Sequence, residues 1–285
     1  MTDEPTNPGT SPAAEPEPEP LVDIVQQELE SIVPLAARIR EAITGLGEVV
    51  VLSVRSIRQA FSWPIGFKDI TYQVEMLGVR SLSLGALVAV FAGLVISLQF
   101  AFFMQRFGIQ HTVGKVVVLT LFRELAPVLT ALTVGARIGS GITAELGSMK
   151  VTEQIDAIRA MGADPVKKLV APRVLACMLV LPALTALADV LGLVAGSAVV
   201  WSQFEIGLKD FYRSVVDTAT IRDFTSGIGK SFIFGFIIAV VGCHKGFNTG
   251  GGTEGVGKAT TETVAIASVA VLLSDFFLTK LLMAL

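Results

Sequence analysis

The chain has 285 residues, of which 52% are hydrophobic and only 16% are charged, and its formal net charge is −3. This composition excludes an ordinary water-soluble domain and predicts a polytopic, all-α membrane protein, because a bilayer requires runs of about 20 apolar residues from each spanning helix. We expect no nucleic-acid partner. Cys177 and Cys243 both lie in apolar runs, so we expect neither a disulfide framework nor a metal site.

The N-terminal region reads as two segments. Residues 1–20 are rich in Pro, Glu and Thr and lack the apolar stretch of a signal peptide, which predicts a disordered acidic tail in the cytoplasm. Residues 21–45 carry apolar positions at alternating spacings of four and three, which predicts an amphipathic helix. Pro34 interrupts this pattern and favours packing on a neighbouring helix over a coiled coil. We assign residues 46–285 to one membrane domain.

A second amphipathic stripe begins that membrane domain. Its apolar positions recur at helical spacing, Arg55 and Arg58 lie off the stripe, and Trp63 closes the segment. An apolar face, cations at the headgroups and a terminal tryptophan are typical of a helix that lies in the membrane interface. A re-entrant or soluble packing helix is the alternative. The stripe consists of Val50, Val54, Ile57 and Phe61.

Five apolar runs are long enough to span a bilayer. Lys and Arg gather before the first run and between the second and the third, which predicts that both segments are cytoplasmic. Five crossings from a cytoplasmic N-terminus place the C-terminus on the opposite side. Arg106 and Lys115, in the first outer loop, are a contrary signal. The predicted spans are Ser81–Gln105, Val116–Ala136, Val174–Ser202, Ser226–Cys243 and Thr263–Ala284.

Ionisable residues stand inside these runs, where each costs about 2.5–3.5 kcal/mol unless it is paired or faces a polar cavity. Arg123 and Glu124 are neighbours in the second run, and adjacent helical residues point about 100° apart. They cannot both satisfy each other, so at least one should reach another helix, water or a ligand headgroup. Asp189, Lys230 and Asp275 are candidate members of the same polar interior. A buried salt-bridge network and a ligand site both remain open.

The connection between the second and third runs is unusually long for an interhelix loop. From Ala144 to Pro165 it is polar, and four residues recur at helical spacing, which predicts a surface helix that docks a soluble partner. Asp156 and Arg159 are three residues apart and able to pair. An ordinary loop is the alternative. The four residues of the stripe are Val151, Ile155, Ile158 and Gly162.

A glycine-rich stretch, Gly252–Ala259, comes within one residue of a phosphate-binding loop. That loop needs a hydroxyl after its lysine to ligate magnesium and a strand leading into it. Here Ala259 follows Lys258, and an apolar span precedes the stretch. We therefore interpret it as a flexible turn before the fifth span and expect no ATP hydrolysis by this chain.

Several motifs, in order and at consistent separations, resemble the MlaE (YrbE) permease family. The resemblance runs from Leu46 to the C-terminus, so residues 46–285 are similar to an MlaE-type permease domain. The matching motifs are Leu121–Pro127, Ala136–Ser140, Thr143–Gly147, Thr152–Ala157, Met161–Pro165, Pro172–Arg173, Lys230–Ser231, Ala259–Val264 and Ser274–Phe276.

The resemblance implies a non-catalytic permease subunit of an ABC transporter. Such a transporter moves phospholipid or a related lipid between the bacterial inner membrane and a periplasmic MCE-domain carrier. The family pattern is a homodimer in which each copy has an N-terminal interfacial helix, five transmembrane helices and a cytoplasmic coupling helix between spans two and three. A separate ABC ATPase would bind ATP and Mg, with no cofactor on this chain, and a STAS-domain subunit is a possible further partner. The N-terminus would be cytoplasmic and the C-terminus periplasmic.

The resemblance also implies two sets of site residues. Phe107 stands where the family has a tyrosine, so a hydroxyl contact to the headgroup is in doubt. Two alternatives from other classes remain, an ion- or proton-coupled secondary transporter and a membrane scaffold without transport activity. The lipid-binding set is Ile96, Gln99, Phe103, Phe107, Arg123, Glu124 and Leu125. The ATPase-coupling set is Glu145, Glu153, Gln154, Ile155, Asp156, Ile158, Met161, Gly162 and Asp164.

Overall fold

The computed structural model describes residues 44–45, 47–59 and 66–284. Within them every regular element is helical, which confirms the all-α class. The predicted tail over residues 1–20 and nearly all of the predicted helix over 21–45 lie outside the described residues, as do Phe61 and Trp63. The chain divides into Met1–Gly47 and Glu48–Leu285, and the second unit contains all the elements considered below.

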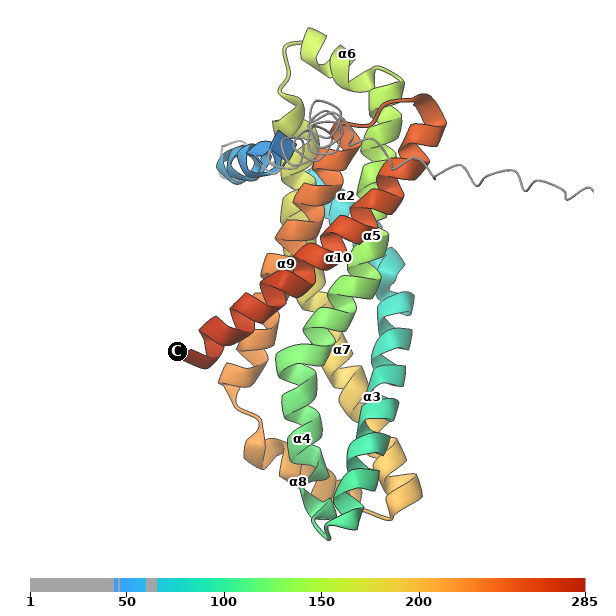
Figure 1. The fold of residues 1–285 in the computed structure, drawn as a ribbon, viewed down its shortest axis with the longest axis vertical. Helices are drawn as coiled ribbons and strands as arrows, with labels where there is room; N and C mark the ends of the chain where they lie inside the picture. The colour runs from blue at the N-terminus through green and yellow to red at the C-terminus, as the bar shows by residue number, and fades with distance from the viewer. Residues whose placement is uncertain (1–43, 46, 60–65, 285) are drawn as a thin grey trace, which may run out of the picture. The chain divides into compact units, whose positions relative to one another are not determined.

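Five helical segments of this unit are long and apolar enough to cross a membrane, as predicted. Each contains one predicted run and extends beyond it, because helical hydrogen bonding continues into polar residues past the apolar stretch. Figure 1 shows them as a bundle of long helices. They are Phe67–Arg106, Gln110–Val151, Val166–Phe204, Ile221–Phe247 and Gly252–Ala284.

Several of these segments are built from shorter elements. The first comprises α2 (Phe67–Leu77), η1 (Val79–Ser81) and α3 (Leu82–Arg106). The second comprises η2 (Gln110–Thr112), α4 (Val113–Thr120), η3 (Leu121–Leu125) and α5 (Ala126–Val151). The third comprises η4 (Val166–Val170) and α7 (Ala171–Phe204), and the last two are α9 (Ile221–Phe247) and α10 (Gly252–Ala284). Residues 48–59 of this unit are also helical.

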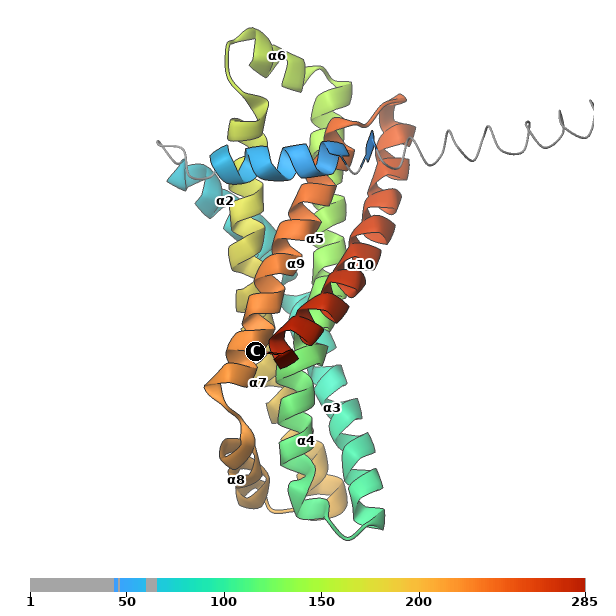
Figure 2. The same cartoon turned by 60° about the vertical axis from the view of Figure 1, so that its left-hand side comes forward.

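Close approach of backbones organises the bundle. The closest pairs are α3 with α7 and α5 with α9, while α10 crosses both α5 and α9 (Figures 1 and 2). A side chain at Gly93 would collide with the backbone of Gly192, and one at Gly235 would meet the carbonyl of Cys177. Small residues at such crossings let membrane helices pack by direct backbone contact. The largest buried cluster, which includes Leu181, lies among α5, α7 and α9.

The second and third spans each contain one π-helical turn, η3 and η4. Pro127 and Pro172 follow these turns, at the start of α5 and α7. Proline has no N–H to donate to the carbonyl four residues earlier, so regular α-helical bonding cannot continue through these positions. The turn η3 contains Arg123 and Glu124 and therefore determines where both side chains point.

The predicted surface helix is shorter than expected. The helix α5 ends at Val151, and α6 begins only at Gln154 and ends at Ala160. Glu153 adopts a left-handed conformation, with φ of 59°, and this breaks the helix between the two. The prediction that Val151, Ile155, Ile158 and Gly162 share one helix face is therefore wrong. Ile155 is fully buried, whereas Val151 is 37% exposed.

One helix at the opposite end of the bundle was not predicted. The helix α8 (Leu208–Thr218) lies in the connection before α9 and packs against α4 (Figure 1). Phe211 and Val215, four residues apart, provide its buried face. No helix was expected in this connection, although this spacing indicates an amphipathic helix.

The glycine-rich stretch is also more regular than expected. Gly252–Ala259 forms the first turns of α10 and follows α9 after a short connection. Gly251 and Gly252 have positive φ angles of 79° and 70°, which glycine adopts at little cost. The stretch is therefore a helix start preceded by a helix, and the prediction of a flexible turn over its whole length is wrong.

Candidate functional site

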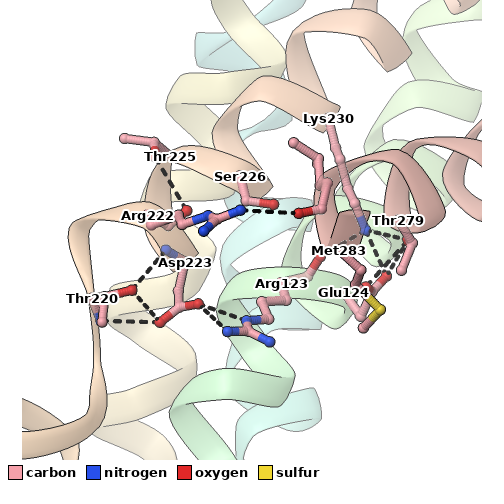
Figure 3. A pocket seen from close by; sticks show the side chains of 11 residues that line it. Arg123, Glu124, Thr220, Arg222, Asp223, Thr225, Ser226, Lys230, Thr279 and Met283 are labelled. Carbon is pink, nitrogen blue, oxygen red and sulfur yellow. Dashed lines mark hydrogen bonds and ion pairs between the residues drawn. The ribbon is translucent and has the colours of Figure 1, made fainter. Parts of the chain in front are cut away.

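Residues from three helical elements meet around one cavity of about 380 Å³, and the charged ones among them come from η3 and α9. Figure 3 shows side chains from η3, α9 and α10 pointing toward one another here. We call these residues, together with Asp275, which pairs with Lys230, the polar cluster. The cavity is lined by Arg123, Glu124, Thr220, Arg222, Asp223, Thr225, Ser226, Lys230, Thr279, Leu282 and Met283.

On one side of the cavity, Arg123 pairs with Asp223. The Nε and Nη2 atoms of Arg123 lie 2.6 Å and 2.5 Å from Oδ1 of Asp223. The other carboxylate oxygen, Oδ2, accepts bonds from the backbone N–H and the hydroxyl of Thr220, at 3.0 Å and 2.7 Å. Thr220 and Asp223 form a reciprocal capping box at the start of α9. The helix cap therefore holds the aspartate that receives Arg123 (Figure 3).

On the other side, Lys230 holds Glu124 and α10. Its Nζ donates to Oε2 of Glu124 and to the Thr279 hydroxyl, both at 2.7 Å. Oδ1 of Asp275 lies 3.0 Å from the same nitrogen. The Lys230 side chain is only 1% exposed, so the ammonium exchanges water for these oxygens. A buried charge requires such compensation.

Lys230 also satisfies the backbone of the π-helical turn. Its Nζ lies 3.0 Å from the carbonyl oxygen of Arg123. That carbonyl is four residues before Pro127, which has no N–H to donate to it. One buried lysine therefore links a proline-interrupted helix, a neighbouring carboxylate and the last span.

The structure resolves the expectation for the two adjacent charges. Arg123 and Glu124 do not satisfy each other, and each reaches a different partner on α9. Lys230 and Asp275 join this cluster, but Asp189 does not. Asp189 is 1% exposed on α7, and its Oδ1 atom has no hydrogen-bond partner among the described residues. Arg222, Asp223 and Thr279 are among the cluster members that lie outside the predicted set.

An apolar cavity of about 460 Å³ adjoins the polar one. Glu124, Thr279 and Met283 line both. The second cavity continues along α10 past Leu272 and Phe276. A single chain therefore presents ion-paired groups and an apolar wall side by side, which is the combination that an amphiphilic ligand requires.

The remaining predicted lipid-binding residues lie elsewhere on the single chain. On α3, Ile96 is half-buried and Gln99 and Phe103 are exposed, and Phe107, directly after α3, is exposed too. None of the four lines the polar cavity. The Phe103 and Phe107 rings are 5.0 Å apart. Leu125 is half-buried and packs against the apolar cluster around α4. Because the predicted site lies between two copies, the role of these residues stays a prediction.

The connection around α6 carries its own ion pairs. Asp156 pairs with Arg159, as its spacing predicted, and with Lys150, both at 3.0 Å. The hydrogen bond from Lys150 lowers the pKa of Asp156 below its usual value of 3.8, so this carboxylate is ionised at neutral pH. Glu145, at the end of α5, pairs with Arg173 at 2.8 Å.

The other predicted coupling residues divide by exposure. Met161 is 76% exposed, and Glu153 and Gln154 are exposed beside it, whereas Ile158 is half-buried. Gly162 has a φ of 79°, which suits glycine. Asp164 accepts bonds from Gln59 at 2.7 Å and from the Val166 N–H at 2.9 Å, so it anchors the return of the chain into α7.

Ion pairs within spanning helices are typical of multi-pass membrane proteins with a transport pathway. Residues 70–281 match the family model described as Permease MlaE. This chain therefore belongs to the MlaE permease family, and it is an ABC transporter permease.

Three curated relatives illustrate the family. A probable ABC transporter permease protein of Rickettsia typhi is 36% identical over 237 residues, 83% of this chain and 92% of the relative. A probable ABC transporter permease protein of Synechocystis sp. is 41% identical over 210 residues, 74% of this chain and 80% of the relative. The chloroplastic protein TRIGALACTOSYLDIACYLGLYCEROL 1 of Arabidopsis thaliana is 34% identical over 232 residues, 81% of this chain and 66% of the relative.

Proposed function

We propose that this permease moves phospholipid or a related lipid between the bacterial inner membrane and a periplasmic MCE-domain carrier. The observation that carries the proposal is the shared wall of the two cavities, where Glu124, Thr279 and Met283 join polar and apolar space. A lipid headgroup would fit the polar cavity, and an acyl chain would fit the apolar cavity. The name of the Arabidopsis relative, which contains that of a galactolipid, supports a lipid substrate.

A homodimer is the second part of the proposal. Only 11% of the most apolar stretch of α10 is buried in a single chain, and Phe103 on α3 and Phe107 directly after it are exposed. Large apolar side chains on both helices are therefore available to a second copy or to lipid. In the proposed dimer, the predicted set on α3 completes the lipid pathway that the polar cluster begins.

ATP hydrolysis belongs to a separate ABC ATPase in this proposal, and that subunit binds ATP and Mg. The exposed surface of α6 and Met161 is the proposed contact for it. Lys150, Arg159 and Lys168 gather at this end of the bundle, which supports a cytoplasmic α6 and a periplasmic C-terminus. A STAS-domain subunit is an optional further partner.

The proposal is tested by lipid transfer in proteoliposomes that contain the permease, its ATPase and an MCE-domain protein. Glu124→Gln keeps an acceptor for Lys230 but removes the charge, so we expect transfer of a fluorescent phospholipid to fall several-fold while the thermal unfolding midpoint changes little. Glu254→Gln, at an exposed position in the first turn of α10, is the matched control and should transfer normally.

Two outcomes would contradict this proposal. Normal transfer by Glu124→Gln and by Arg123→Gln, together with a photo-crosslinker at position 103 that captures no lipid, would remove the lipid site. Transfer that follows an ion gradient and needs no ATP would instead support the ion-coupled alternative. The relatives are named ABC transporter permeases, which favours ATP-driven transport over that alternative and over a passive scaffold.

A further inference from the structure

Another cavity, distinct from the polar and apolar cavities described above, lies toward the end of the bundle that carries α6. Its volume is about 630 Å³, and it shares no residue with the polar cluster. The helix α2 packs on α7. The cavity is lined mainly by residues of α2 and α5, with Arg80 of η1 and Thr260 of α10. We call it the α2–α5 cavity.

Two arginines of this cavity have no carboxylate partner. Among the described residues, the guanidinium of Arg80, in η1, forms no hydrogen bond or ion pair, and the guanidinium of Arg137, in α5, bonds only to the Ser81 hydroxyl. The Ser81 hydroxyl in turn donates to the Leu77 carbonyl at 2.6 Å. Each guanidinium has five N–H donors, so most of their donors remain available to a ligand.

The carboxylate that lines the cavity is already neutralised. Glu145 pairs with Arg173, whose side chain is 4% exposed, at 2.8 Å. The cavity therefore keeps an excess of two positive charges. Of the other arginines in the spanning segments, Arg123 and Arg173 have carboxylate partners, Arg222 donates to the Leu282 carbonyl, and Arg106 lies over the Phe102 ring.

The position of Arg137 makes this excess unusual. It lies within the second span, and its bond to Ser81 places it level with the start of α3. An unpaired arginine at that depth reaches toward the phosphates of the bilayer surface. Guanidinium groups bind phosphate with paired hydrogen bonds, and two of them on one cavity form a favourable anion site.

The rest of the wall distinguishes a lipid from a free anion. Met76 and Leu77 are half-buried and Ile138 is buried, and together they form the apolar wall beside the two arginines. Tyr72, whose side chain is exposed, and Gln73 add polar groups from α2. A small hydrated anion would contact only the arginines. A lipid would contact the arginines through its phosphate and the apolar wall through its acyl chain.

We infer that the α2–α5 cavity binds an anionic glycerophospholipid of the adjacent leaflet. Its phosphate lies on Arg80 and Arg137, and its acyl chain lies along Met76, Leu77 and Ile138. This site is separate from the proposed transport pathway and does not depend on it. Its occupant bridges α2 to α5, which contact each other little in the bundle.

The test uses the purified full-length chain in detergent with dioleoyl phosphatidylglycerol, dioleoyl phosphatidylcholine or inorganic phosphate added. We expect phosphatidylglycerol to raise the thermal unfolding midpoint more than phosphatidylcholine does. The Arg80→Gln, Arg137→Gln variant should lose at least four fifths of that difference. The control variant Lys68→Gln removes a cation from α2 outside the cavity. It should keep the full difference between the two lipids. Native mass spectrometry of retained lipid provides the second readout.

Three results would overturn the inference. An unchanged preference for phosphatidylglycerol in the double variant would exclude these arginines, and an equal shift with inorganic phosphate would assign a free anion. If the double variant no longer forms dimers but still retains lipid, the α2–α5 cavity contacts a second copy of the chain. If Arg137→Gln does not fold, Arg80→Gln with Arg137→Lys keeps the second charge and should still lower the preference at least twofold.

Discussion

Lys230 connects three parts of the molecule through one nitrogen atom. It contacts Glu124 and the Arg123 carbonyl on the second span and Asp275 and Thr279 on the last span. The ammonium is 1% exposed, while the Glu124 and Asp275 side chains are 37% and 18% exposed. Removing the lysine is costly chiefly because the more buried carboxylate, that of Asp275, then lacks compensation.

Replacing Lys230 with Met should therefore lower the free energy of unfolding by about 3–5 kcal/mol, the usual cost of breaking a buried ion pair. The thermal unfolding midpoint and the fraction of monodisperse protein in size-exclusion chromatography measure the effect. Lys209→Met, at an exposed position of α8, is the control and should change stability by less than about 0.5 kcal/mol.

A companion variant separates charge from packing. Adding Glu124→Gln and Asp275→Asn to Lys230→Met removes both orphaned carboxylates, so a large part of the lost stability should return. If the triple variant is as unstable as Lys230→Met alone, the electrostatic explanation is wrong. The lost stability then comes mainly from packing around the lysine side chain and from its bond to the Arg123 carbonyl.

The sequence predicted correctly that the charged residues form a polar interior, but it did not predict which residues pair with them. An arginine next to a glutamate in an apolar run indicated a polar interior, because helix geometry prevents both from pairing with each other. Asp223 and Thr279 were missed as members, since only tertiary folding brings the start of α9 and the end of α10 to η3. A Thr-x-x-Asp cap and the four-residue spacing of Asp275 and Thr279 were the available signals.

At the scale of elements, the connection between α5 and α7 is a short helix held between two chain reversals. Ile155 buries one side of α6 in the main core cluster, while the opposite side, with Gln154 and the adjacent Met161, is exposed. Asp156 receives Lys150 and Arg159 and fixes the helix to the end of α5. The exposed side is therefore the part available to a soluble partner.

Met161→Asp should release the ATPase and leave the fold intact, because Met161 is 76% exposed. We expect the amount of ATPase that co-purifies with the permease to fall at least tenfold. Val216→Asp, at a position that is 74% exposed on α8 at the other end of the bundle, should retain it. Undiminished co-purification with Met161→Asp would exclude this surface as the docking site.

The sequence located the spans well because twenty apolar residues have few alternatives to a membrane helix. It did not locate the break in the surface helix, because the left-handed conformation of Glu153 has no strong signal in a glutamate. The π-helical turns were also missed. Pro127 and Pro172 indicated interruptions, but the form of each interruption depends on which neighbouring group takes the freed carbonyl.

At the scale of the whole molecule, a single chain leaves much apolar surface on α3 and α10. Phe91, Phe102 and Phe103 on α3 and Phe276 and Phe277 on α10 are each more than half exposed. Lipid covers part of this surface, and the proposed second copy covers another part. The proposed lipid pathway is complete only when α3 and the polar cluster face the same space.

Two copies should therefore be present in the assembled transporter. Native mass spectrometry of the complex with its ATPase should give a mass that contains two 30.1 kDa permease chains. Disulfide crosslinking between single cysteines introduced at exposed positions of α3 or α10, in a background without Cys177 and Cys243, should identify the contacting helices. A complete and active complex with one permease chain would exclude the dimer.

The π-helical turn η3 also changes how the second span has to be drawn. A π-helical turn takes in one residue more than a regular turn, and one residue corresponds to about 100° of rotation. The half before η3 packs on α8, and the half after it packs on α9 and α10. A single helical wheel through Gln110–Val151 would thus put one half on the wrong side. Deleting one residue from η3 would restore a regular helix and turn α4 away from its present neighbour, so the length of this span is as constrained as its composition.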